Sequence, residues 1–262
     1  MSDDQERDVD EWMERPWPVP RAQRMILSRG TPFTDMNSNG DLFESRAAGY
    51  GIVLILGTSG SGKSTLAHSL IHWASMRCDR PLCYMGFSKD WIDVLPEFMR
   101  ERAVVLESLE QLHLVPQGAI LLLDDTGIWA AARRAASKVN VKLSKFAQVA
   151  RHLDVTIVVT AQAVRAIDFA SAMVAETTTL VKWFSNKGVF YENPSWGVRI
   201  QGAQQELFQA AGSRSAEACR PYYWCDDTSQ LGTFPVPEWV LGDAVSRPIG
   251  SLTPEQLEAI LE

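Results

Sequence analysis

The sequence predicts an α/β fold in which a mostly parallel central sheet carries helices on both faces. Short apolar runs rich in β-branched residues alternate with segments of helical periodicity, and a glycine-rich loop joins the first such run to the first helix. Strands of a parallel sheet are covered on both faces by their crossover helices, so they appear as continuous apolar runs. The chain has 262 residues, of which 46% are hydrophobic and 22% charged, as in an ordinary globular protein with one main core.

The expected core occupies residues 21–186, where strands and helices alternate. Buried strands are indicated wherever a run is short, apolar and bounded by turn residues. The predicted strands span residues 49–56, 81–87, 119–123, 155–160 and 177–184. The predicted helices between them span residues 63–77, 96–103, 130–153 and 169–175.

Both ends of the chain differ from this core. Among the first 15 residues seven are acidic and two are basic, and prolines follow at positions 16, 18 and 20. Alternate prolines favour an extended segment, so we expect residues 1–20 to form a flexible tail. Residues 187–262 are expected to form an extension packed on the core. Its predicted elements are hairpin-like strands over 188–200 and 221–237, a helix over 203–211, and a last helix opening at Thr253-Pro254.

Several classes of protein are disfavoured by composition. The apolar runs, such as Ile52–Leu56 and Ala119–Leu123, reach only five residues, whereas a membrane-spanning helix needs about 20. The acidic N-terminus lacks the basic and apolar regions of a signal peptide. The spacing of Cys78, Cys83, Cys219 and Cys225 is unlike that of zinc sites, which favours buried reduced thiols.

A phosphate-binding loop is the strongest motif. Residues 57–64 follow the pattern G-x4-G-K-S and lie between an apolar strand and a helix, as the motif requires. Glycines let backbone N–H groups of such a loop point at a β-phosphate, and the helix adds the positive end of its dipole. We expect Lys63 to reach the β- and γ-phosphates of ATP and Ser64 to bind Mg²⁺. The predicted nucleotide-binding residues are Gly57, Thr58, Ser59, Gly60, Ser61, Gly62, Lys63, Ser64 and Thr65.

Two later strands end on polar residues. The apolar run 120–123 leads into Asp124-Asp125, and the run from Val155 leads into Gln162. Because the carboxyl ends of parallel strands meet at one edge of a sheet, we expect these side chains beside the phosphate-binding loop. Asp124 is the predicted Mg²⁺ ligand, and Asp125 would orient or activate an attacking water. Gln162 would contact the γ-phosphate or that water. A hydrolase needs such a water-positioning carboxylate, whereas a small-molecule kinase does not.

The segments GTSGSGKST, ILLLDD and VARHLDVTIVVTAQ, in this order, resemble the FtsK/HerA superfamily of DNA-pumping ATPases. Residues 48–185 carry the resemblance, which within the superfamily is strongest to the genome-packaging ATPases of membrane-containing icosahedral viruses. It implies a RecA-like P-loop NTPase core that forms a homo-oligomeric ring, usually a hexamer. It also implies ATP and Mg²⁺ as cofactors and ATP-driven translocation of double-stranded DNA. A capsid or membrane-vertex partner, and a virion-associated or cytoplasmic location, would follow.

The resemblance also implies roles for single residues. Lys63 and Ser64 correspond to the Walker A pair, Asp124 to the Walker B metal carboxylate and Gln162 to the γ-phosphate sensor. The chain departs from the pattern at Asp125, where many members have glutamate. Aspartate is one methylene shorter than that glutamate.

A basic stripe indicates nucleic acid independently of the resemblance, although the net charge of the chain is −7. Residues 126–153 contain six basic and no acidic side chains. On a helix, four of them fall within about 80° of one another, opposite an apolar face. These four, Arg134, Lys138, Lys142 and Lys145, are the predicted DNA contacts, and the binding would be sequence-tolerant and salt-sensitive. Alternatively, the stripe is a solvated face balanced by acids elsewhere in the fold or on a neighbouring subunit.

Ring ATPases complete their sites with an arginine from the next subunit, which stabilises charge on the transferring phosphate. The candidates are Arg133, Arg151 and Arg165, of which we take Arg151 as the catalytic candidate. The sequence does not choose among them, and each can equally be an ordinary surface arginine.

Two other functions remain open. One is a P-loop ATPase for assembly or secretion without DNA translocation, and the other is a small-molecule kinase. Hydrolysis that DNA stimulates would separate the translocase from both.

Overall fold

The computed structural model of the chain describes residues 51–76, 78–87, 89–124, 145–164, 177–190, 192, 194–226, 228–234 and 236–241. The described strands are β1 (Gly51–Leu56), β2 (Leu82–Met85), β3 (Ala103–Leu106), β4 (Ile120–Leu123), β5 (Thr156–Ala161), β6 (Thr177–Val181), β7 (Tyr222–Cys225) and β8 (Gln230–Thr233). The described α-helices are α4 (Lys63–Ser75), α5 (Glu97–Arg100), α8 (Asn186–Phe190), α9 (Pro194–Ala211) and α10 (Ala216–Cys219). Short 3₁₀ helices are η1 (Lys89–Val94), η2 (Leu109–Leu114) and η6 (Glu238–Val240), and residues 145–150 are also helical.

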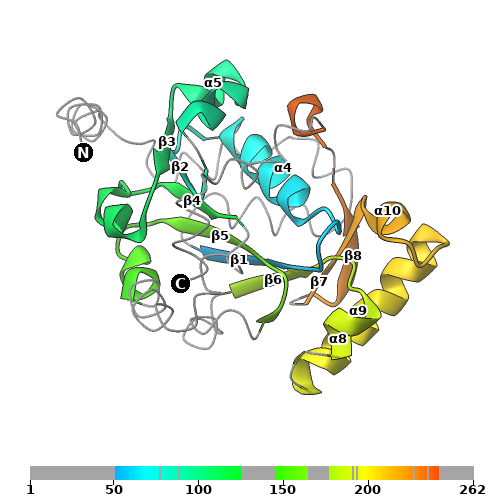
Figure 1. The fold of residues 1–262 in the computed structure, drawn as a ribbon. Helices are drawn as coiled ribbons and strands as arrows, with labels where there is room; N and C mark the ends of the chain where they lie inside the picture. The colour runs from blue at the N-terminus through cyan, green and yellow to red at the C-terminus, as the bar shows by residue number, and fades with distance from the viewer. Residues whose placement is uncertain are drawn as a thin grey trace, which may run out of the picture.

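These strands form one sheet in the order β3-β2-β4-β5-β1-β6-β7-β8 (Figure 1). Strands β1 to β6 pair in parallel, and β7 and β8 add an antiparallel hairpin to the β6 side. β1 lies between β5 and β6, and β5 separates β1 from β4. The carboxyl ends of β1, β4 and β5 therefore meet at one edge of the sheet.

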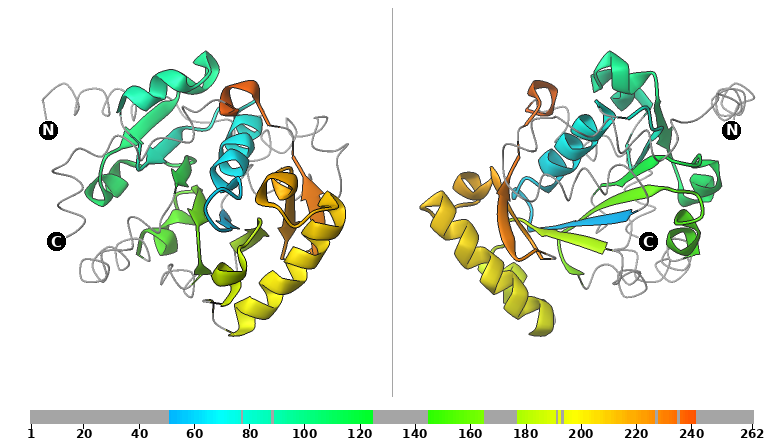
Figure 2. Two further views of the ribbon diagram at one scale, coloured as in Figure 1. Left: turned by 45° about the vertical axis from the view of Figure 1, so that its right-hand side comes forward. Right: turned by 180° about the vertical axis from the view of Figure 1, so that it is seen from behind.

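Both faces of the sheet are buried, as the continuous apolar strands predict. Along β1, Val53 and Ile55 pack with α4, η1 and α5, whereas Ile52, Leu54 and Leu56 face the other side. That other side is covered by the helix at 145–150, by η2 and by α9, so α4 and α9 lie on opposite faces of the sheet (Figure 2). The α/β fold with a mostly parallel sheet and helices on both faces is confirmed.

Most of the expected elements that fall on described residues are confirmed. They are β1, α4, β2, β4, β5, β6 and the hairpin of β7 and β8. The strand β3 was not expected, because only two residues separate it from α5 and its first residue, Ala103, ends the helix predicted over 96–103. Cys78, Cys83, Cys219 and Cys225 are buried free thiols. In the described part of the chain, no helix is long and apolar enough to cross a bilayer.

The predicted hairpin-like strands at 188–200 are wrong. This segment contains the end of α8 and the first seven residues of α9. Pro194 is tolerated there because the first turn of a helix needs no backbone donor. Ile200, Ala203 and Leu207 then recur at helical spacing and are buried. The expected tail at 1–20, most of the helix at 130–153, the helix at 169–175 and the last helix at Thr253 lie outside the described residues.

The buried side chain of Arg80 joins three segments at the edge of the sheet opposite the carboxyl ends. Its guanidinium donates to the carbonyl oxygens of Gly118 (2.5 Å), Ala119 (3.0 Å) and Asp154 (2.8 Å). A fourth bond reaches the hydroxyl of Thr156 at 2.8 Å. Bonds to a charged donor are stronger than neutral ones, so this group fixes the starts of β4 and β5 beside that of β2.

We expect Arg80→Met to lower the free energy of unfolding by about 3 kcal/mol or more, because it leaves buried carbonyl groups without donors. Urea denaturation measures the loss. Arg100→Met is the matched control, because Arg100 is exposed and its nearest carboxylate, Asp93, is 3.7 Å away. Equal, small losses in the two variants would contradict the structural role of Arg80.

Candidate nucleotide-binding site

The loop between β1 and α4 has the backbone geometry of an anion site. Gly60 and Gly62 have φ angles of 78° and 83°, in the left-handed region that favours glycine. Gly62 is the N-cap of α4, and its carbonyl accepts the N–H of Leu66 at 3.0 Å. The N–H groups of the first helical turn have no hydrogen-bond acceptor within the helix, and they point toward the loop. Together with the helix dipole they favour a phosphate group.

The amine of Lys63 folds back over this loop. Its Nζ donates to the carbonyl oxygen of Thr58 at 3.2 Å, and only 8% of the residue is exposed. The same carbonyl accepts the N–H of Ser61, also at 3.2 Å. The positive charge therefore lies over the backbone that would surround a phosphate.

A carboxylate lies at the mouth of the loop, as predicted. Oδ1 of Asp124, directly after β4, accepts a hydrogen bond from the hydroxyl of Ser64 at 3.1 Å. It accepts a second from the hydroxyl of Thr160 in β5 at 2.5 Å. Only 7% of Asp124 is exposed, and Thr160 is fully buried. Carboxylate and hydroxyl oxygens side by side suit Mg²⁺, which prefers oxygen ligands.

Thr160 was not among the predicted site residues. A signal existed, because it is a hydroxyl-bearing residue near the end of an otherwise apolar strand. Parallel pairing of β4 with β5 brings it to Asp124, and that neighbour cannot be read from local sequence. Its bond orients the carboxylate toward Ser64.

Gln162 stands beside the start of the phosphate-binding loop. It follows directly after β5, and the carbonyl of Ala161 accepts the N–H of Gly57 at 3.2 Å. The side chain is exposed. The structure therefore places Gln162 next to the loop, and its role as a sensor stays a prediction.

Other predicted residues lie away from the site or outside the described chain. Arg151 is exposed in the turn before β5, at the edge of the sheet opposite the loop. It does not reach the loop of its own chain. Lys145 is exposed on the helix at 145–150. The predicted residues Asp125, Arg133, Arg134, Lys138, Lys142 and Arg165 lie outside the described residues.

The segment after β6 supports the loop from behind, which the sequence did not indicate. The carbonyl of Trp183 accepts the N–H of Thr58 at 3.1 Å, and the hydroxyl of Thr58 accepts the N–H of Ser185 at 3.1 Å. A β-carbon built at Gly188 would lie 2.6 Å from the Thr58 methyl group, so glycine is required for this approach. The first residues beyond β6 therefore hold the start of the loop.

Lys182 ties the same segment to the start of β7. Its fully buried amine donates to the carbonyls of Arg220 and Tyr222, each at 2.6 Å. Burial lowers the pKa of Lys182 to about 7; the neighbouring Cys219 opposes this shift, and the charge of Arg220 adds to it. A neutral amine keeps two N–H groups, which is enough for both carbonyls.

Glu192 supports the turn that follows Gln162. Its Oε1 accepts the N–H of Val164 at 2.8 Å, and its Oε2 is buried with no hydrogen-bond partner among the described residues. The turn after Gln162 is thus held by a residue just before α9.

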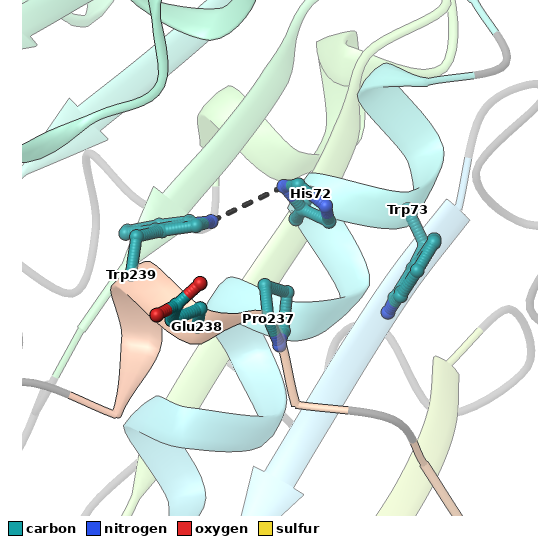
Figure 3. Close-up of a pocket in the computed structure, with 5 residues that line it drawn as sticks. All are labelled: His72, Trp73, Pro237, Glu238 and Trp239. Atoms are coloured by element: carbon teal, nitrogen blue, oxygen red, sulfur yellow. Dashed lines mark hydrogen bonds between the residues drawn. The ribbon is translucent and has the colours of Figure 1, made fainter.

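A separate groove of about 510 Å³ lies near the last turn of α4, away from the loop. His72, Trp73, Pro237, Glu238 and Trp239 line it (Figure 3). Nε1 of Trp239 donates to Nδ1 of His72 at 3.2 Å, and burial lowers the pKa of His72. This contact anchors η6 to α4, and the lining offers aromatic surface rather than phosphate ligands.

A mostly parallel sheet with a phosphate-binding loop after β1, and a carboxylate on β4 two strands away, is the fold of a P-loop NTPase. No protein-family model and no curated protein sequence matches the chain. Its fold is similar to that of several solved ATPases.

One is B204, the DNA-packaging ATPase from Sulfolobus Turreted Icosahedral Virus, at 12% identity and a TM-score of 0.45 over 71% of this chain and 98% of that chain. Another is the genome packaging NTPase B204 from Sulfolobus turreted icosahedral virus 2 in complex with ATP-gammaS, at 13% identity and a TM-score of 0.40, covering 72% of this chain and 98% of that chain. A third is EssC (ATPases 2 and 3) from Geobacillus thermodenitrificans, at 15% identity and a TM-score of 0.43, covering 79% of this chain and 44% of that chain.

We expect the stability difference between the wild type and Lys182→Met to depend on pH. Between the folded pKa of about 7 and the ordinary value of 10.5, the unfolded chain holds the Lys182 proton that the folded chain releases. The free energy of unfolding of the wild type, relative to the variant, therefore rises with pH across this window, by up to about 1.4 kcal/mol per unit. Below about pH 7 both states hold the proton and the difference becomes constant. Urea denaturation at several pH values between about 7 and 10.5 measures the free energy of unfolding of both proteins. A difference between them that stays constant over this range would contradict the prediction.

Proposed function

We propose that the chain is a Mg²⁺-dependent ATP hydrolase that drives translocation of double-stranded DNA. The observation that carries the enzymatic part is the hydrogen bond between Ser64 and Asp124 at the mouth of the phosphate-binding loop. It joins the first turn of α4 to the end of β4, which are the two places where a P-loop enzyme holds its metal.

ATP and Mg²⁺ fit the residues present. The loop amides of residues 57–65 would hold the phosphates, and Lys63 would pair with the β- and γ-phosphates. Ser64 and Asp124 would hold Mg²⁺, with Thr160 orienting the carboxylate. When bound, the ion neutralises charge on the phosphates. Asp125 and Gln162 would position the water that attacks the γ-phosphate.

A catalytic role for Arg151 would require a ring of identical subunits, which we propose to be a hexamer. Because Arg151 is exposed at the edge of the sheet opposite its own loop, it can complete only the site of a neighbouring subunit. A capsid or membrane-vertex protein would anchor the ring, in a virion or in the cytoplasm.

The DNA part rests on the basic stripe. At its described end, Lys145 is exposed while Phe146, Ala147 and Ala150 are buried in the core, as an apolar face opposite a basic face requires. Arg134, Lys138 and Lys142 would extend this exposed face, and a polyanion would relieve the repulsion among these charges.

We expect Lys63→Ala to reduce ATP turnover by about 100-fold or more, because the charge that stabilises the transferring phosphoryl group is lost. Asp124→Asn should cause a comparable loss and raise the Mg²⁺ concentration needed for half-maximal rate. Phosphate release is measured with and without double-stranded DNA at two salt concentrations, and Lys187→Ala, an exposed lysine beyond β6, is the control. Full turnover in Lys63→Ala would refute the site.

Stimulation by DNA of any sequence, weaker at high salt, is the expected result for the wild type. Turnover that DNA does not change would favour an assembly or secretion ATPase. Transfer of phosphate to a small molecule in place of water would favour a kinase.

We expect the triple variant Lys138→Ala, Lys142→Ala and Lys145→Ala to weaken DNA binding by about 10-fold or more at low salt. The slope of log affinity against log salt should fall by about three, one for each lost phosphate contact. Fluorescence anisotropy with two unrelated duplexes measures both. The control removes three exposed charges elsewhere, at Lys89, Arg100 and Lys187. Equal affinities for the triple variant and the control would place the DNA elsewhere.

A further inference from the structure

An arginine that the sequence did not single out lies against the phosphate-binding loop within the same chain. Arg220 follows α10, and its side chain packs on Gly62, the residue before Lys63. A β-carbon built at Gly62 would lie 3.0 Å from Cγ of Arg220 and 3.8 Å from its Cδ. The guanidinium begins at the next atom beyond Cδ, so the charged group is within one side-chain length of the first amides of α4.

The guanidinium of Arg220 is exposed and has no hydrogen bond or ion pair among the described residues. Two other arginines in the described ranges, Arg102 and Arg199, do have such partners. Arg102 donates to the carbonyls of Cys78 and Ser75, and Arg199 pairs with Asp226 at 2.7 Å. A charged group with no counter-ion, beside a loop whose amides suit an anion, matches a phosphate.

The backbone of Arg220 is held firmly although its side chain is exposed. Its carbonyl accepts the buried amine of Lys182, and its N–H donates to the carbonyl of Glu217 at 3.1 Å. Ser215 caps α10 by accepting the N–H of Ala218 at 3.2 Å, and Cys219 is fully buried. The backbone of Arg220 is therefore already ordered before an anion binds. Binding then restricts only the side chain, which limits the conformational entropy lost.

We propose that Arg220 contacts the phosphate chain of the bound nucleotide from within the same subunit. The inference rests on the proposed nucleotide site and is separate from an arginine supplied by a neighbour. The planar guanidinium offers paired donors that match phosphate oxygens. The site therefore includes a residue between α10 and β7, beyond the residues that carry the resemblance.

The test compares Arg220→Ala and Arg220→Lys with the wild type in binding ATPγS, ADP and AMP, measured by calorimetry with Mg²⁺ present. Arg214→Ala is the matched control, because Arg214 is an exposed arginine on the same segment whose guanidinium lies over Phe208. Arg220→Ala should weaken ATPγS and ADP binding by about 10- to 100-fold and AMP binding much less. Arg220→Lys should recover part of the loss, and Arg214→Ala should bind all three like the wild type.

The melting temperature without nucleotide should be unchanged in both Arg220 variants, because the side chain is exposed. Equal binding by Arg220→Ala and the wild type would overturn the proposal. So would an equal loss for all three nucleotides together with a lower melting temperature, which would show that Arg220 only supports the loop. If the wild type binds nucleotide and Lys63→Ala does not, failure at Arg220 leaves the proposed function intact. If the wild type binds no nucleotide, both proposals fail.

Discussion

The parallel pairing of β1 with β5, and of β5 with β4, is the constraint on which the site depends. Because the three strands run in the same direction, their carboxyl ends and the polar residues there meet at one edge. Gly57, Asp124 and Gln162 are far apart in the chain and become neighbours through this register alone. A slip of β5 by one residue would turn Thr160 to the opposite face and remove its bond to Asp124. The packing that fixes the register is therefore also what assembles the chemistry.

Local sequence was enough to predict the central part of this arrangement. The loop 57–64 combines residues that need left-handed backbone with a lysine and a hydroxyl at fixed spacing, and its fold is dictated within a few residues. Asp124 and Gln162 were placed by a simple rule about strand ends. Each of these features is encoded in one short segment, so no knowledge of distant contacts was needed.

Most of the parts that sequence did not predict arise from contacts between distant segments. Nothing in the local sequence distinguishes Lys182 from any other residue after a strand. Its amine is buried and hydrogen-bonded only because the start of β7 lies beside it. Glu192 likewise gains a role only because α9 packs near the turn after β5. The aromatic and glycine residues of 188–200 suggested strands, although Pro194 and the spacing of buried residues favour a helix. The helical signal was thus present in the local sequence, and the glycine and aromatic residues outweighed it in the prediction.

Residues from the C-terminal part of the described chain contact the helix α4 at both of its ends. At its first turn, Gly62 is packed against Arg220, whose carbonyl accepts the amine of Lys182. At its last turn, His72 accepts a hydrogen bond from Trp239. The two contacts lie about 15 Å apart along the helix axis. A tilt of α4 would therefore change two contacts at once, the packing of Arg220 on Gly62 and the hydrogen bond between Trp239 and His72.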